Sequence, residues 1–283
     1  MKHCIICGNQ NQELIYNDLL IKCPECGFVT ANLEIESQDF KAIYSEKYFK
    51  GEAYDDYIRD KADLQQNFRS RIVQLGKIIP PEKLEKILEI GCAYGFFGEL
   101  ATKAWKTDYT GIDIAREAIE YAKSTLNLNV FCVDYLQSFK QGFTFDTVFM
   151  WDVIEHLANP MTVVERISKE ISRGGFIVIT TGDIGAFLPK LQGRKWRMIV
   201  PPIHLHYFNK KSITKLLAGN GFEVIDISYP AVSRSLRQIF YALFILKREK
   251  CPVILKKIYE IIPEKMNISL NTFDIMMVVA RKA

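Results

Sequence analysis

The stretch that decides the fold is Ile87-Leu88-Glu89-Ile90-Gly91-Cys92-Ala93-Tyr94-Gly95 in this chain of 283 residues. Its first half is a short apolar run, which predicts a buried β-strand. Its second half is a turn of glycine and alanine, which lets the backbone approach a ligand closely at the carboxyl end of that strand. Such a turn is a weak signal by itself, so its meaning depends on the strands that follow.

Short apolar runs alternate with helical segments after this turn. The strand-like runs cover 86–90, 109–113, 129–133, 145–150, 176–180, 222–228 and 273–281. Helical patterns run through Phe68, Ile72, Leu75 and Ile79, where two prolines end the helix, and over 212–218. This alternation predicts an α/β fold with a parallel sheet and crossover helices.

Two acidic residues follow neighbouring strands. Asp113 ends the second run, 22 residues after Gly91, where a carboxylate can accept both hydroxyls of an adenosine ribose. Asp134 follows the third run, where the adenine amino group would lie. An acidic residue at the end of each of these two strands is a far more specific signal than the glycines alone.

With the glycine turn and these two acids, the chain resembles the class I S-adenosylmethionine-dependent methyltransferases over roughly residues 44–230. The resemblance implies a Rossmann-like sheet of seven strands, mostly parallel with an antiparallel last strand. In that family the loop matching Gly91–Gly95 holds the methionine part of the cofactor, and the acids matching Asp113 and Asp134 hold the ribose and the adenine. Ala93 stands where a glycine is usual, a common substitution.

The resemblance also implies further contacts to S-adenosylmethionine. These residues are Glu89, Ile114, Tyr135, Trp151 and Tyr57. Tyr57 forms an aromatic cluster with Tyr48 and Tyr54 ahead of the core, where related enzymes place a lid over the donor. We expect one of the three tyrosines to be functional.

The acceptor site is expected after the fourth and fifth strands. Methyl transfer from a sulfonium requires a positioned acceptor and, for a hydroxyl, a base, which histidine supplies well. His204 and His206 share one side of an extended segment, and their His-x-His-Tyr-Phe ending resembles that of enzymes methylating nucleotide-linked sugars. Glu155 and His156 resemble the pair that binds a divalent cation in quinone-type methyltransferases, and a supporting role for both is equally compatible.

Four cysteines at the N-terminus have the spacing of a zinc ribbon. They are Cys4, Cys7, Cys23 and Cys26, two Cys-x-x-Cys pairs separated by 15 residues. Each pair places two thiolates on a tight turn, and two such turns complete a tetrahedral sulfur shell for structural Zn²⁺. The other three cysteines have no partner spacing.

The composition is that of a globular protein, with 48% apolar and 25% charged residues. The net charge of +4 is spread along the chain, which argues against a nucleic-acid footprint. The longest apolar run is too short to cross a bilayer, and no secretory signal is visible. We therefore expect a cytoplasmic protein with reduced thiols.

These patterns divide the chain into segments. We expect a zinc ribbon at 1–30, a helical lid or linker at 31–83, the methyltransferase core at 84–230, a helical insertion or cap at 231–272 and the last core strand at 273–283. The insertion contains two basic amphipathic stretches. We favour a cap on the domain or a contact between two copies over docking on a membrane surface.

The preferred function is methylation of a small metabolite, a sugar or nucleotide-linked sugar hydroxyl, without a nucleic-acid partner. Two enzymatic alternatives stay open: an RNA methyltransferase with a zinc ribbon that binds RNA, and a quinone-type O-methyltransferase. A degraded dinucleotide fingerprint is disfavoured because Phe96 and Phe97 crowd a pyrophosphate site. A binding module with a vestigial core is disfavoured because the glycines and acids of the donor site are intact.

Overall fold

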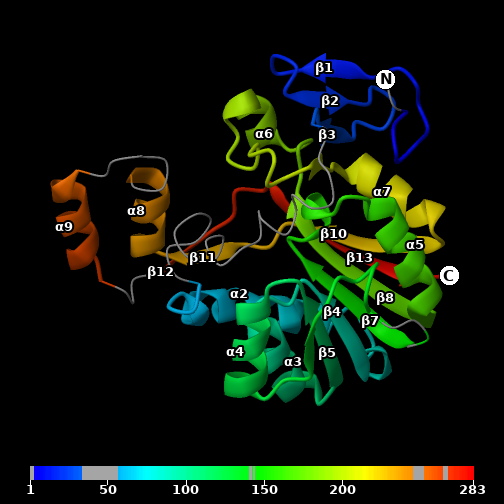
Figure 1. Cartoon of the computed structure of the whole chain (residues 1–283), viewed down its shortest axis with the longest axis horizontal. Coiled ribbons are helices and arrows are strands. Elements are labelled where there is room, and N and C mark those ends of the chain that lie inside the picture. The colour runs from blue at the N-terminus through cyan, green and yellow to red at the C-terminus, as the bar shows by residue number, and fades with distance from the viewer. Residues whose placement is uncertain (1–2, 34–56, 140–141, 143, 245–251, 264–266) are drawn as a thin grey trace.

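The computed structural model describes residues 3–33, 57–139, 142, 144–244, 252–263 and 267–283. Seven strands form the central sheet in the order β10-β13-β8-β7-β4-β5-β6 (Figure 1). They are β4 Lys86–Ile90, β5 Asp108–Asp113, β6 Val130–Cys132, β7 Phe145–Trp151, β8 Ile171–Gly182, β10 Phe222–Ser228 and β13 Ile275–Lys282. The pairs among β4 to β8 are parallel, whereas β13 runs antiparallel to both β8 and β10. The predicted methyltransferase-type sheet is confirmed.

Helices cover both faces of this sheet. They are α2 Lys61–Leu75, α3 Phe96–Trp105 and α4 Arg116–Leu126 on one face, and α5 Pro160–Glu170 and α7 Lys210–Gly219 on the other. Successive side chains of a strand point to opposite faces, so Ile87 packs with α2 and α3, and Leu88 packs with α5 and α7. Burial of both faces explains why the strands are continuous apolar runs and not alternating ones.

Two boundaries differ from the sequence expectation by four or more residues. The helix predicted to run as far as Ile79 ends at Leu75, because Gly76 follows and the next residues form turns back to the Leu75 carbonyl. The strand β8 begins at Ile171 and not at Phe176, with a register irregularity against β7 that Gly174 and Gly175 accommodate.

The N-terminal ribbon shares a sheet with the core. Strands β1 Glu13–Ile15, β2 Leu20–Lys22 and β3 Val29–Ala31 form an antiparallel sheet whose fourth strand is β9 His206–Tyr207. In the register, Val29 lies opposite Tyr207 and Thr30 lies opposite His206. The ribbon therefore lies beside α6 Phe187–Gln192 and α7, at the end of the molecule remote from α3 and α4 (Figure 1).

The segment before β13 contains more than helices. Strands β11 Val232–Ser235 and β12 Asn267–Leu270 form a two-stranded sheet that carries α8 Leu236–Phe244 and α9 Val253–Ile261. The Asn67 side chain of α2 holds β11 through both backbone groups of Ser233, at 3.0 and 2.6 Å. Of the helices in the described ranges, none is long and apolar enough to span a membrane.

Candidate active site

The turn after β4 has the backbone shape of a donor-binding loop. Gly91, Ala93 and Gly95 all have left-handed backbones, with φ of 74°, 44° and 74°. A Cβ atom at Gly91 would lie 2.4 Å from Val153, and one at Gly95 would lie 2.6 Å from Leu128. Glycine is therefore required at both positions, while Ala93 adopts the strained conformation directly.

Asp113 fixes this loop from the end of β5. Its two carboxylate oxygens accept hydrogen bonds from the backbone N–H groups of Ala93 and Ala115, each at 2.8 Å. Burial raises the pKa of the Asp113 carboxyl, and the backbone donors counteract that rise. The loop after β4 and the acid at the end of β5 are thus joined directly in the structure.

Glu89 is a buried residue of β4, two positions before Gly91. Its buried carboxylate accepts a 2.5 Å hydrogen bond from the hydroxyl of Tyr109, and burial raises the pKa of Glu89 well above its ordinary value. This predicted cofactor residue therefore joins β4 to β5 inside the core.

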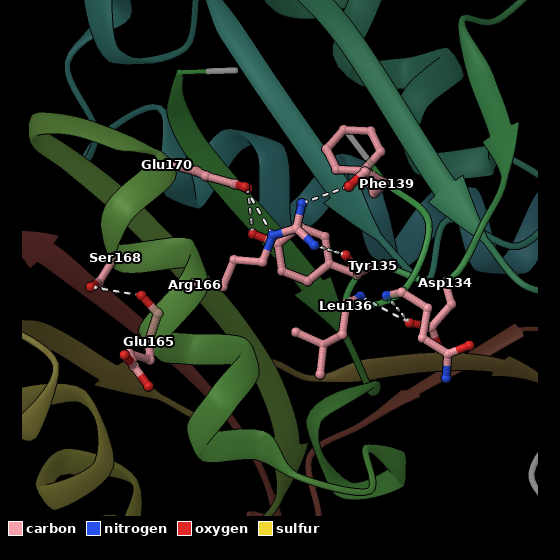
Figure 2. A network of polar contacts seen from close by, with 9 residues as sticks. Asp134, Tyr135, Leu136, Phe139, Glu165, Arg166, Ser168 and Glu170 are labelled. Carbon is pink, nitrogen blue, oxygen red and sulfur yellow. Dashed lines mark hydrogen bonds and ion pairs between the residues drawn. The ribbon is translucent and has the colours of Figure 1, made fainter. Parts of the chain in front are cut away.

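The Asp134 loop is held by an arginine that sequence reasoning missed. One oxygen of Asp134 accepts the backbone N–H groups of Leu136 and Gln137, both at 2.9 Å (Figure 2). Arg166 on α5 donates to the carbonyls of Tyr135 and Phe139 and pairs with Glu170 at 2.9 Å. Only the position of Arg166, at helical spacing from Glu170, signals this role in the sequence.

Two predicted donor contacts lie elsewhere. Tyr135 is buried against the Arg166 guanidinium, and its hydroxyl donates to Glu170 at 2.7 Å (Figure 2). Trp151 is buried in the aromatic core beneath α2 and α3, with its ring centre 5.0 Å from that of Phe97. The sequence places both after strand ends but does not reveal to which face of the sheet they point.

Aromatic and apolar side chains flank the donor loop. Tyr57 stacks on Tyr94 and Phe96, with ring centres 5.5 and 5.4 Å apart. Ile114, which follows Asp113, is 40% exposed beside the loop. Tyr48 and Tyr54 lie outside the described residues.

Three titratable side chains converge after β7. The ligand atoms of Glu155, His156 and His204 all lie within 4.8 Å of one another. Glu155 is buried, and neither of its oxygens has a hydrogen-bond partner in the described part of the chain. Burial and the nearby charge of Asp152 raise the pKa of Glu155 to about 8. Asp152 itself has a left-handed backbone, with φ of 53°, and accepts a 2.9 Å hydrogen bond from Thr180.

The two histidine rings of this cluster are oriented by carbonyl groups. Nδ1 of His156 lies 2.8 Å from the Ile203 carbonyl, and Nδ1 of His204 lies 2.7 Å from the Met198 carbonyl. A carbonyl only accepts, so each Nδ1 carries the proton and each Nε2 keeps its lone pair. Burial lowers the pKa of His156 to about 3 and also lowers the pKa of His204.

His206 occupies a different environment from His204. Its Nδ1 lies 3.1 Å from the Thr30 hydroxyl, and its ring centre is 5.4 Å from that of Phe28. Both contacts come from the ribbon, and burial lowers the pKa of His206 to about 4. The structure thus places His204 with Glu155 and His156, whereas His206 lines the same small cavity as Glu155 and His204 and also contacts the ribbon.

The ribbon gathers its four cysteines into one cluster. Their sulfur atoms all lie within 4.8 Å of one another, with Cys4 and Cys26 at 3.7 Å and Cys7 and Cys23 at 3.4 Å. The two turns have the same shape, because Gly8 and Gly27 both follow the second cysteine with positive φ. Such a sulfur shell suits a tetrahedral metal.

The fold and these sites define a methyltransferase. The methyltransferase domain family model matches residues 61–227, and the chain belongs to that family. The crystal structure of magnesium protoporphyrin IX methyltransferase from Synechocystis PCC 6803 with bound S-adenosylmethionine covers 88% of this chain and 100% of its own, with 15% identity and a TM-score of 0.51. An S-adenosylmethionine-dependent methyltransferase from Clostridium acetobutylicum has the same TM-score, with 11% identity over 80% of this chain and 97% of its own. The chain therefore has the fold of the S-adenosylmethionine-dependent class.

The matches to curated relatives cover a smaller share of each chain. The ubiquinone biosynthesis O-methyltransferase of Actinobacillus pleuropneumoniae is 24% identical over 138 residues, which is 44% of this chain and 58% of the relative. The mitochondrial enzyme of the same name from Dictyostelium discoideum is 24% identical over 170 residues, 53% of each chain. The chain thus spans little more than half the length of these relatives.

Proposed function

We propose that this protein is an S-adenosylmethionine-dependent O-methyltransferase that acts on the hydroxyl of a small acceptor. The observation that carries the proposal is the convergence of Glu155, His156 and His204 next to Asp152, at the same edge of the sheet as the Gly91 loop. The names of the relatives favour a phenolic, quinone-type acceptor over the sugar hydroxyl that the His-x-His ending suggests. A phenolic acceptor therefore replaces the sugar hydroxyl as the preferred one.

The donor site would be formed by the loop Gly91 to Gly95 with Asp113 and Asp134. Because Ala93 and Asp113 are already hydrogen-bonded, the loop is held in shape before the cofactor arrives. When bound, S-adenosylmethionine supplies an electrophilic methyl group on a sulfonium. The chain's part is to hold that methyl in line with the acceptor oxygen.

His204 would take the acceptor's proton at Nε2. In the transfer the acceptor oxygen would bond to the methyl carbon as the carbon–sulfur bond breaks and its electron pair stays on sulfur. The hydroxyl proton would pass to His204, whose Nδ1 proton is held by the Met198 carbonyl. Since burial lowers the pKa of His204, the ring is neutral and ready to accept a proton at neutral pH.

The same cluster fits a divalent cation. Two histidines and a buried carboxyl group, each offering one ligand atom within 4.8 Å of the others, form a donor set of the kind that holds such ions. When bound, a cation would polarise the acceptor hydroxyl and lower its pKa. In this alternative Glu155, His156 and His204 would be its ligands, and His204 would not act as the base.

We also propose that the ribbon cluster binds structural zinc. A tetrahedral shell with Zn–S bonds of about 2.3 Å has sulfur atoms about 3.8 Å apart, and the Cys4–Cys26 distance of 3.7 Å fits that geometry. The four cysteines would hold the ion without an open position, so its role is to stabilise the fold.

The direct test is a methyl-transfer assay with S-adenosylmethionine and two acceptor classes, ortho-dihydroxybenzenes and nucleotide-linked sugars. We expect methyl ethers of the phenols. Exclusive methylation of the sugars would contradict the quinone-type proposal, and absence of S-adenosylmethionine binding in calorimetry would contradict the donor site. A chelator with and without added Mg²⁺ separates a cation-assisted reaction from one that uses His204 alone.

A further inference from the structure

The ribbon is connected to the Glu155, His156 and His204 cluster through the backbone of one residue, Leu205. The backbone N–H of Leu205 donates to the carbonyl of Glu155 at 2.9 Å, and the carbonyl of Leu205 accepts from the N–H of Ala31 at 2.8 Å. Leu205 directly follows His204 in the chain. Leu205 thus joins the backbone of Glu155 to strand β3 of the ribbon.

The Thr30 side chain adds two contacts to this connection. Its hydroxyl donates to the same Leu205 carbonyl at 3.1 Å and lies 3.1 Å from Nδ1 of His206. Thr30 therefore contacts the residues on both sides of a single peptide bond, just after His204. This backbone has little freedom to rotate while β3 is in place.

The ribbon itself is anchored on the core by other groups. Asn209 donates to the carbonyl of Cys26 at 3.3 Å, and Lys215 pairs with Glu25 at 2.8 Å. Phe28 packs against Phe208 with ring centres 5.2 Å apart. These contacts lie around the turn of the second cysteine pair. The conformation of that turn therefore determines how the ribbon packs on the core.

We propose that the N-terminal ribbon is a positioning element of the acceptor site, in which Thr30 fixes the Leu205 backbone and thereby the ring of His204 beside His156. The proposal rests on the function proposed for His204. It assigns to the ribbon a role in the reaction geometry, in addition to its own stability, and requires no contact between the ribbon and the acceptor.

The test compares Thr30→Val with the matched variant Thr107→Val in the full-length, zinc-loaded protein. Thr107 also donates its hydroxyl to a backbone carbonyl, that of Glu85 at 3.0 Å, but lies just before β5. We expect Thr30→Val to lower kcat by about tenfold, the upper end for one lost hydrogen bond. S-adenosylmethionine affinity by calorimetry and zinc content should stay unchanged. Thr30→Ser, which keeps the hydroxyl, should restore kcat.

Two readouts do not depend on activity. In a spectrum of isotope-labelled histidine side chains, Thr30→Val should shift the signals of His204 and His206, while Thr107→Val should not. In zinc-stripped wild-type protein, hydrogen exchange should accelerate over residues 204–208 but not in β4. Unmoved His204 signals, or unchanged protection at 204–208 after the ribbon has lost its own protection, would overturn the proposal. Weakened S-adenosylmethionine binding in Thr30→Val would also overturn it, because the ribbon would then act on the donor site and not on the acceptor site.

Discussion

His156 and His204 face each other edge to face, with ring centres 4.7 Å apart and an interplanar angle of 70°. They come from segments almost fifty residues apart, one after β7 and one before β9. Each ring is fixed by its own carbonyl acceptor, and one nitrogen of each ring lies within 4.8 Å of an oxygen of the buried Glu155.

Replacing His204 by alanine should lower turnover by about 10² to 10⁴, the range for loss of a general base. Donor affinity should not change, because the proposed donor contacts lie at the ends of β4, β5 and β6. Turnover is measured with saturating acceptor, and affinity by calorimetry. If turnover survives in His204→Ala but is lost in His156→Ala or with a chelator, the proton leaves by another route.

Asp113→Asn should weaken S-adenosylmethionine binding by about 1.5 to 3 kcal/mol, the usual contribution of a hydrogen bond to a charged group. Asp108→Asn is the matched control, since Asp108 lies exposed at the other end of the same strand. Calorimetric titration measures both. Equal affinities of the two variants would place the ribose elsewhere.

Arg166→Met should lower the free energy of unfolding by about 3 to 5 kcal/mol, because Glu170 would be left buried without its partner. Lys169→Met on the same helix removes an exposed ion pair with Glu165 and should leave stability unchanged. Urea unfolding of the two variants makes the comparison. Similar losses in both would mean that the Arg166 network contributes little.

Glu89 should make stability depend on pH. Its pKa is raised by burial, so the native state holds a proton that the unfolded state releases above a pH of about 4.5. The native state then binds more protons, and the free energy of unfolding falls as the pH rises from that value towards the native pKa. In urea unfolding between pH 5 and 8, Glu89→Gln should show a shallower decline than the wild type. The exposed Glu82→Gln should follow the wild type.

Protein purified without added zinc should contain about one zinc per chain. Cys23→Ser should unfold the ribbon and leave the central sheet protected, because the sheet has its own core. Elemental analysis and hydrogen exchange test these statements separately. A metal-free chain with a fully protected ribbon would show that the cysteines do not need an ion.

The central sheet and the donor loop were predictable because their signals are local. An apolar run buried on both faces, a glycine turn and an acid at the strand end are all read within a few residues, as at Ile87 to Gly95 and Asp113. The Cys-x-x-Cys spacing is equally local, and the structure brings its four sulfur atoms together.

The rest depends on contacts that no short pattern encodes. Strand β9 has two residues, and its partner β3 lies about 175 residues earlier, so neither periodicity nor turn chemistry indicates the pairing. The side to which Tyr135 points is set by Arg166, a residue in a later helix. The pairing of β11 with β12 likewise spans two intervening helices.

The position of β3 between β2 and β9 has a consequence for the order of folding. During synthesis the ribbon emerges early, yet one edge of β3 has no partner until residue 207 has left the ribosome. An unpaired edge strand is a site for wrong pairing, and closing so long a loop is entropically unfavourable until the core has formed. Ribbon and core should therefore reach their final state in one late, cooperative step, and a nascent chain halted before residue 207 should be markedly more prone to aggregate than one released after it.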